Sequence, residues 1–249
     1  MERESLHIPE SLVAALRDAR SVAALTGSGV SAESGVPTFR EAQTGLWARF
    51  DPQELATPGA YARDPRLVWE WYAWRRELVD AATPNPGHEA LAELEGFISQ
   101  FALITQNVDG LHRRAGSQNV VELHGNIRRS KCSREGVIAE PHEDDADVPP
   151  SCPRCGASLR PDVVWFGESL PADALSEAFD AAWSCDLFLS AGTSGLVQPA
   201  ASLPFEALNA GAMVVEVNPN ETPLTRHVDH SLRGWAGEVL PALVETACG

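Results

Sequence analysis

One histidine in this chain stands where a general base could act. His124 directly follows the short apolar segment 120–123 and precedes Gly125. Imidazole has an unperturbed pKa near physiological pH, so it can take up and release a proton during a reaction. For a lone histidine at a strand end, a structural bond to backbone is the better interpretation. Neighbouring polar clusters must therefore decide whether His124 is catalytic.

Other polar clusters also follow apolar segments, and their side chains suit a nucleotide. Gln106, Asn107 and Asp109 follow residues 101–105. Amide and carboxylate groups provide the donors and acceptors that a carboxamide or a ribose diol requires. Turn formation is the alternative interpretation, because Asn and Asp favour turns. Two further clusters contain Gly192, Thr193 and Ser194, and then Asn218 and Glu221.

A run of small residues follows the first apolar segment, 22–25. Gly27, Ser28 and Gly29 allow a sharp turn whose amides are predicted to face phosphate. The spacing Gly27-x-Gly29-x-x-Ala32 fits a dinucleotide-binding fingerprint. Asp51 has roughly the spacing of a dehydrogenase's ribose-binding acid, but residues 45–52 do not resemble a strand. Because the run continues instead through Pro37, Thr38, Phe39 and Arg40, simple hydride transfer is not favoured.

Tyr72 and Arg75 could recognise a carboxylate. Their spacing places both on one face of a helix. A guanidinium binds carboxylate through two hydrogen bonds, and a phenol can add a third. Core packing is the competing interpretation for this aromatic segment, which also contains Trp69, Trp71 and Trp74.

Three cysteines form most of a zinc site. Cys152 and Cys155 provide one Cys-x-x-Cys half. Cys132 begins a second half in which Glu135 stands in place of a cysteine, and His142 is a rival fourth ligand. Packing without metal is the alternative. Because no ligand comes from the strand-end clusters, the predicted zinc is structural.

Apolar segments interleaved with helical patterns predict a doubly wound parallel α/β sheet. Ligands of such sheets bind where the strands end, so the polar clusters should converge. Asp64 and Pro65 predict a helix start. The expected strands are 22–26, 101–105, 120–123, 187–191 and 213–217, and the expected helical segments are 8–20, 52–82 and about 88–98.

Composition restricts the partners of this chain of 249 residues. Its 35 acidic and 19 basic side chains give a net charge of −16, which argues against nucleic acid as a partner. We expect a cytoplasmic protein without a membrane partner, because no apolar stretch is long enough to span a bilayer and the N-terminus does not resemble a signal peptide. A disulfide framework is not expected from five unevenly placed cysteines.

Five motifs in order make the chain resemble the sirtuin family of NAD-dependent protein-lysine deacylases over residues of about 20–240. They are residues 26–40, 105–112, 122–125, 164–168 and 192–194. The resemblance implies one catalytic domain, 1–249, with a Rossmann-like core, a helical insertion and a small zinc module. The expected boundaries are about 8–40, 84–127 and 161–249 for the core, about 41–83 for the insertion and about 128–160 for the module.

The resemblance assigns roles residue by residue. His124 becomes the general base that activates a ribose hydroxyl, Asp109 holds the nicotinamide carboxamide, and Asn107 orders the reactive ribose. The other implied NAD-binding residues are Gly27, Ser28, Gly29, Ser31, Phe39, Arg40, Gln106, Gly192, Thr193, Ser194, Asn218, Glu221 and Ala236. The implied edges of an acylated peptide, bound as an added strand, are Phe166, Gly167 and Glu168 on one side and Val197 on the other. Core packing is the alternative for Trp165 and Phe166.

The implied reaction transfers an acyl group from a protein lysine to ADP-ribose and releases nicotinamide and O-acyl-ADP-ribose. Tyr72 and Arg75 match the pair of class III sirtuins, which implies succinyl and malonyl substrates with weaker acetyl removal. Protein ADP-ribosyl transfer and a catalytically silent NAD-sensing module are the alternatives. The set of Asn107, Asp109 and His124 argues against the silent module.

Overall fold

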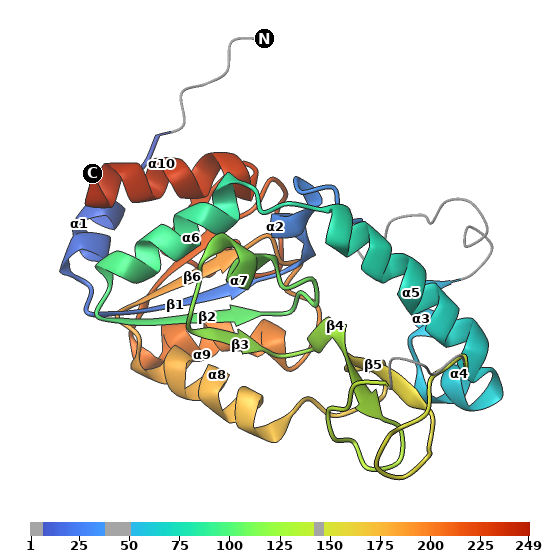
Figure 1. Ribbon diagram of the computed structural model, residues 1–249. Coiled ribbons are helices and arrows are strands. Elements are labelled where there is room, and N and C mark those ends of the chain that lie inside the picture. The colour runs from blue at the N-terminus through green and yellow to red at the C-terminus, as the bar shows by residue number, and fades with distance from the viewer. Residues whose placement is uncertain (1–6, 38–50, 142–146) are drawn as a thin grey trace.

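A six-stranded parallel sheet forms the centre of the computed structural model, which describes residues 7–37, 51–141 and 147–249 (Figure 1). Its order, β3-β2-β1-β6-β7-β8, places later strands on both sides of β1. This confirms the predicted doubly wound sheet, with its change of direction beside β1. The strands are β1 (Ser21–Thr26), β2 (Gln100–Thr105), β3 (Val120–Glu122), β6 (Leu187–Ala191), β7 (Met213–Val217) and β8 (His230–Leu232).

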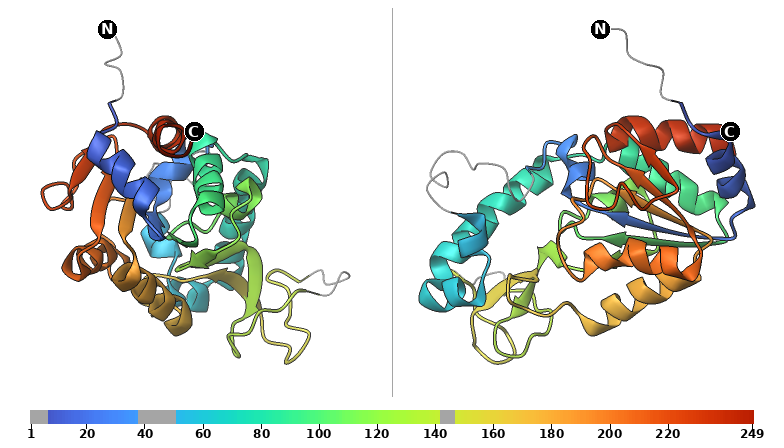
Figure 2. Two further views of the ribbon diagram at one scale, coloured as in Figure 1. Left: turned by 90° about the vertical axis from the view of Figure 1, so that its left-hand side faces the viewer. Right: turned by 180° about the vertical axis from the view of Figure 1, so that it is seen from behind.

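Helices cover both faces of the sheet (Figures 1 and 2). Val22 and Ala24 of β1 pack into the core beneath the first group of helices, whereas Ala23 and Leu25 pack into the core beneath the second. Burial on both faces explains why the strands are apolar without alternation. The first group is α1 (Glu10–Asp18), α6 (Pro86–Phe97) and α10 (Ala236–Cys248), and the second is α8 (Ala172–Ser184) and α9 (Leu203–Ala210).

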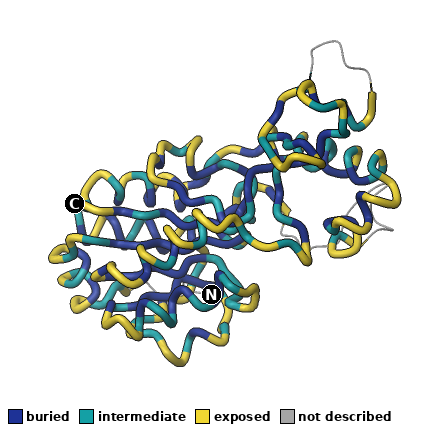
Figure 3. Tube along the Cα trace, turned by 90° about the horizontal axis from the view of Figure 1, so that it is seen from below, coloured by how far each residue is buried: buried dark blue, intermediate teal, exposed yellow. Residues whose placement is uncertain are grey.

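A second lobe lies beyond the carboxyl ends of the strands, on the right of Figure 1. It contains α3 (Pro52–Leu55), α4 (Pro58–Arg63), α5 (Pro65–Ala81) and the antiparallel pair of β4 (Gly125–Cys132) and β5 (Leu159–Val163). Buried stretches run through both the sheet layer and this lobe (Figure 3). A separate apolar cluster, which includes Trp71, Tyr72 and Trp165, stabilises the lobe.

Local capping explains where two helices begin. Asp64 accepts a hydrogen bond from the Leu67 amide at 2.9 Å, so α5 begins at Pro65 as predicted. The Asn85 side chain accepts from the amide of Gly87, and α6 therefore begins at Pro86, two residues before the expected start. None of the described helices is long and apolar enough to cross a membrane.

Candidate active site at the carboxyl edge of the sheet

The polar clusters converge because the parallel strands end in register. Thr26 is paired with both Thr105 and Ala191, Thr105 with Glu122, and Ala191 with Val217. The residues that follow these positions therefore emerge along one edge of the sheet, as the sequence predicts. The shorter helices α2 (Ser28–Ala32) and α7 (Leu111–Ala115) begin at the same edge.

Three glycines allow two strand-end turns to touch backbone to backbone. A Cβ atom on Gly29 would lie 2.7 Å from the carbonyl oxygen of Gly192, and one on Gly192, whose φ is +60°, would lie 2.5 Å from the nitrogen of Val30. The amides of Gly27 and Gly29 donate to the carbonyl groups of Ala191 and Gly192. The expectation that amides of this turn face phosphate is therefore wrong for these two, which hold the neighbouring turn instead.

His124 lies half-buried between β3 and β4, and one of its ring nitrogens is fixed. Its Nδ1 is 2.9 Å from the carbonyl oxygen of Gln106. A carbonyl only accepts, so Nδ1 carries the hydrogen and Nε2 of the neutral ring holds the lone pair. Burial lowers the pKa of His124, although the bond to Gln106 opposes this effect. The ring is therefore neutral and able to take up a proton at neutral pH.

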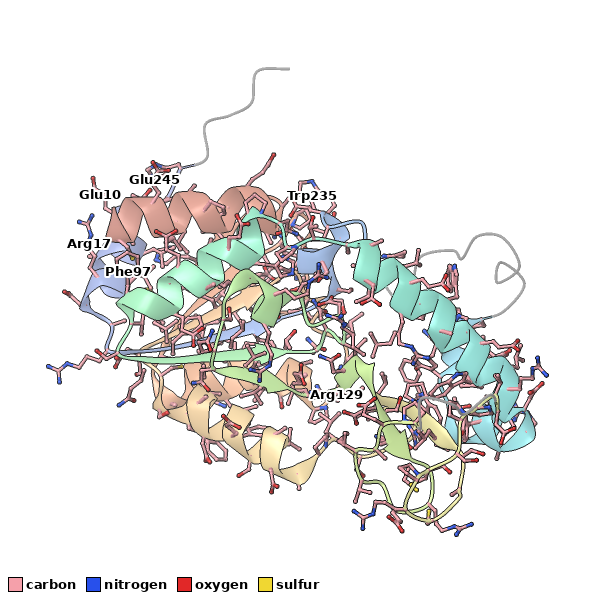
Figure 4. All side chains as sticks on the ribbon, in the orientation of Figure 1. Glu10, Arg17, Phe97, Arg129, Trp235 and Glu245 are labelled. Carbon is pink, nitrogen blue, oxygen red and sulfur yellow. The ribbon has the colours of Figure 1, made fainter. Side chains whose placement is uncertain are left out.

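Ionic contacts anchor the turn that carries His124. Glu122 accepts a hydrogen bond from Asn126 at 2.8 Å and pairs with Arg129 at 2.7 Å. Arg129, labelled in Figure 4 beside β4, also pairs with Asp162 of β5 at 2.9 Å. This network joins the parallel sheet to the second lobe. The sequence did not predict this network, because its link to the second strand of the lobe joins Arg129 to Asp162, 33 residues away, and leaves no local pattern.

Asn107, Ser31 and Asp109 form a buried hydrogen-bonded group at the same edge. The Asn107 amide donates to the Gly27 carbonyl and to the Ser31 hydroxyl, both at 3.0 Å. Asp109 accepts from the Leu111 amide at 2.9 Å and also interacts with the Ser31 hydroxyl. Burial raises the pKa of Asp109, and these hydrogen bonds oppose that effect. The structure thus brings together three residues that the sequence assigned to one site.

Two buried histidines without a predicted role support this group. His88 accepts from the Asn85 amide through Nδ1, so its Nε2 donates to the Ser31 hydroxyl 3.3 Å away. Nε2 of His112 lies 2.9 Å from the Thr26 hydroxyl. The ring centroids of His88 and His112 are 4.8 Å apart. Burial lowers the pKa of His88 to about 4 and that of His112 to about 3. Both rings are therefore neutral in the folded protein.

These neutral histidines predict that acid destabilises the fold. Each has a folded-state pKa below the unfolded value of about 6.5, so the unfolded chain binds more protons as the pH falls from there towards 4. Lowering the pH from 6.5 to 5 should reduce the free energy of unfolding by about 2 kcal/mol per histidine. Urea unfolding at several pH values should show that the free energy of unfolding depends less steeply on pH in His112→Gln than in the parent protein. Exposed His7→Gln is the control, and an unchanged slope in His112→Gln contradicts the assignment.

Hydrogen bonds link some of the side chains predicted to bind the adenosine end of NAD. Gln106 donates to the Thr193 hydroxyl at 3.1 Å, and Asn218 donates to the Thr193 carbonyl at 2.8 Å. Glu221 is exposed, 3.9 Å from Arg233. Among the remaining predicted positions, Ser28 is exposed, Ser194 is half-buried and Ala236 is buried at the start of α10. Phe39, Arg40 and His142 lie outside the described residues.

A buried carboxylate organises the loop after β7. Glu216 accepts hydrogen bonds from the hydroxyl groups of Thr222, Thr225 and Ser231. The bond from Thr225 measures 2.6 Å. These contacts hold the loop that begins at Asn218. The sequence pattern predicted only that Glu216 belongs to a strand.

Tyr72 of α5 contacts the segment 164–168, and Arg75 lies one turn further along the same helix. Tyr72 is buried, and its oxygen accepts a hydrogen bond from the indole nitrogen of Trp165 at 3.0 Å. The Arg75 guanidinium lies 5.1 Å from the centroid of Trp71. Burial raises the pKa of Tyr72 to about 12, against the opposing charge of Arg75, so the phenol keeps its hydrogen.

Both predicted peptide edges contain an exposed apolar side chain. Phe166 is 48 % exposed and Val197 is 37 % exposed, whereas Trp165 is buried. The core-packing interpretation therefore holds for Trp165 and not for Phe166. Gly167, with a φ of +87°, turns the chain between Phe166 and Glu168. The Glu168 carboxylate is bound within the protein by Arg160 and by the Trp165 amide.

The three predicted cysteine ligands meet in the second lobe. Their sulfur atoms all lie within 4.8 Å of one another, and those of Cys132 and Cys155 are 3.4 Å apart. Two matching turns present them: the Gly136 amide donates to the Cys132 carbonyl, and the Gly156 amide donates to the Cys152 carbonyl, both at 2.9 Å. Three convergent thiols fit a structural zinc ion that needs one more ligand.

The match between the turns also places Glu135. Glu135 precedes Gly136 as Cys155 precedes Gly156, so it occupies the corresponding position of its turn. In this conformation its carboxylate pairs with Arg154 at 3.2 Å. Glu135 thus lies in the right turn for the fourth ligand, while its carboxylate is directed to Arg154.

Zinc removal is expected to destabilise the second lobe. Purified protein should contain about one zinc ion per chain, and Cys152→Ser should lower both the zinc content and the melting temperature, because a structural zinc contributes directly to folding. Metal analysis and thermal unfolding with and without a chelator measure this. Glu135→Ala and His142→Ala compare the two candidate fourth ligands, with exposed Glu140→Ala as control. Zinc-free protein whose folding is insensitive to chelation contradicts the prediction.

The fold and site together define a doubly wound nucleotide-binding protein with a base at the strand ends and a cysteine-rich lobe. The family described as Sir2 matches residues 27–199. The chain belongs to this family, which confirms the sirtuin resemblance.

Curated relatives align over nearly the whole chain. NAD-dependent protein deacylase 1 of Pseudomonas aeruginosa is 53 % identical over 245 residues, covering 95 % of this chain and 98 % of the relative. NAD-dependent protein deacylase of Aeropyrum pernix is 55 % identical, covering 90 % and 91 %. The alignments therefore span nearly all of both proteins in each pair.

Solved structures show the same fold. A Sir2 homologue in complex with NAD has a TM-score of 0.90 and 50 % identity, covering 99 % of this chain and 96 % of the other. A Sir2–p53 peptide–NAD⁺ structure has a TM-score of 0.84 and 32 % identity, covering 96 % and 98 %.

Proposed function

We propose that this protein is an NAD-dependent protein-lysine deacylase that prefers succinyl and malonyl groups over acetyl groups. The observation that carries the proposal is the fixed tautomer of His124, which leaves Nε2 as a proton acceptor among the converged strand-end clusters. The relatives' names and the NAD complex of a solved homologue support the same activity.

The converged side chains fit NAD. Asn107 and Asp109 provide amide and carboxylate groups at one end of the site, and Thr193 and Asn218 provide hydroxyl and amide groups at the other, where Gln106 is bonded to Thr193. Bound NAD supplies a ribose carbon whose bond to nicotinamide breaks as the acyl oxygen attacks it. Asn107 is held by Ser31 and the Gly27 carbonyl, and Gln106 and Asn218 are held by Thr193.

His124 and Asp109 have separate tasks in the proposed reaction. Nε2 of His124 takes a proton from a ribose hydroxyl, which can then attack the acyl carbon, while Nδ1 stays bonded to Gln106. Water completes the release of the free lysine amine and leaves the acyl group on ADP-ribose. Asp109 receives the carboxamide of nicotinamide, and Asn107 orders the ribose. The fixed bond to Gln106 prevents the imidazole from turning its protonated nitrogen toward the substrate.

Tyr72 and Arg75 support the acyl preference. Succinyl and malonyl groups end in a carboxylate, which a guanidinium binds with charge-assisted hydrogen bonds and a neutral phenol can also contact. Phe166 and Val197, both exposed, would border the peptide strand that presents the acylated lysine. A solved Sir2 structure is bound to an acetylated peptide, in keeping with a peptide substrate.

Mass spectrometry of matched acetyl-, malonyl- and succinyl-lysine peptides incubated with the protein and NAD tests this proposal. Free lysine peptide, nicotinamide and O-acyl-ADP-ribose should appear together, and fastest for the succinyl and malonyl peptides. ADP-ribose attached to protein would indicate ADP-ribosyl transfer instead. Absence of nicotinamide release would indicate a binding module.

A further inference from the structure

The hydrogen bond between Trp165 and Tyr72 has a defined direction. An indole nitrogen carries a hydrogen and cannot accept, so Trp165 Nε1, 3.0 Å from the phenolic oxygen, must be the donor. The Tyr72 oxygen is the acceptor, so the phenol's own hydrogen takes no part in this contact. Because burial raises the pKa of Tyr72 to about 12, that hydrogen is retained at neutral pH.

The indole of Trp165 is held on several sides. The Arg160 guanidinium carbon lies 3.3 Å from the centroid of the ring, and the Tyr61 ring centroid lies 5.3 Å away. Glu168 accepts two hydrogen bonds from Arg160, at 2.6 and 2.9 Å, and a third from the Trp165 amide at 2.9 Å. This arrangement fixes both the backbone and the ring, so the indole N–H keeps its position.

We propose that Trp165 is a positioning residue that determines acyl specificity through Tyr72; the inference rests on the proposed deacylase function. The indole N–H donates a hydrogen bond to the phenolic oxygen. Tyr72 therefore offers a ligand its own O–H, a hydrogen-bond donor, beside the positive charge of Arg75. A carboxylate can only accept, so a dicarboxylic acyl group matches both partners. An acetyl group offers no such acceptor at its end.

Trp165→Phe tests the proposal, because it keeps a ring and removes the N–H. The ratio of kcat/KM for succinyl over acetyl peptides should fall roughly 3- to 10-fold, as expected for one hydrogen bond. Incorporation of benzothienylalanine at position 165, in which sulfur replaces the N–H, should give the same fall with less change in shape. Trp183→Phe, which removes an exposed indole on α8, is the matched control and should keep the ratio.

A double-mutant cycle with Tyr72→Phe separates positioning from packing. If Trp165 acts through the phenol, Trp165→Phe should change the ratio in the parent protein and not in the Tyr72→Phe background. A change that persists without the phenol, or an equal loss for both peptides, overturns the inference. A parent protein that deacylates neither peptide refutes the proposed function itself, and the inference with it.

Discussion

His124→Asn is expected to lower kcat about 10²- to 10⁴-fold, the range that general base catalysis contributes. The asparagine amide can still donate to the Gln106 carbonyl, so the turn between β3 and β4 should be preserved. No atom of asparagine replaces Nε2 as proton acceptor. Nicotinamide release and product formation under saturating NAD measure the loss.

NAD binding provides the internal control for this variant. Calorimetry should give an affinity within a few-fold of the parent protein, because the network of Asn107, Ser31 and Asp109 does not include His124. Exposed His227→Asn should keep full turnover. A His124→Asn protein that retains activity refutes the assignment of the base.

The same histidine sets the acidic limb of the pH profile. Burial lowers the pKa of His124, so the neutral, base-competent ring persists to a lower pH than a free imidazole allows. We expect kcat/KM to stay constant as the pH falls to 6.5 and to decrease only at a lower pH. The stability measurements described above identify where unfolding begins and must precede this comparison.

Arg75→Met should reduce kcat/KM for succinyl and malonyl peptides about 10- to 100-fold, because a hydrogen-bonded partner of a charged group contributes about 1.5–3 kcal/mol. Acetyl peptides have no terminal carboxylate and should lose much less. The succinyl-to-acetyl ratio, measured with one peptide sequence, is the readout. Methionine retains much of the apolar stem that packs in α5.

Arg66→Met is the matched control for Arg75→Met, since it removes a positive charge from the same helix at an exposed position. It should leave the ratio unchanged. Equal loss for all acyl groups in Arg75→Met would indicate a structural role. A parent protein that prefers acetyl peptides would contradict the acyl preference and leave the deacylase proposal intact.

Local sequence patterns predicted the strands well, because burial on both faces requires continuous apolar segments. The strand predicted at 22–26 and the cap of Asp64 agree with β1 and α5 within a residue. The antiparallel pair of β4 and β5 was missed. Its residues are mixed in polarity and pair across more than 25 positions of the chain, which leaves no local period to detect.

Chemistry was predictable where residue type alone limits it. Three clustered thiols have few common uses, so Cys132 could be selected from residue type, whereas His124 and Asp109 could be selected only through the resemblance to the sirtuin family. The phosphate-facing role of the Gly27 and Gly29 amides was wrong, because the sequence does not show that another turn approaches them. His88 was missed because its partner Ser31 lies 57 residues away.

The sequence by itself determined which groups are present, the parallel sheet and the edge at which its strands end. Only the tertiary structure decided which nitrogen of His124 carries the hydrogen and that the Tyr72 oxygen accepts a hydrogen bond from Trp165. Hydrogen-bond direction depends on the partner, and the partners, Gln106 and Trp165, come from distant segments. Proton position in a folded protein is therefore set by packing, and residue type supplies only the range of choices.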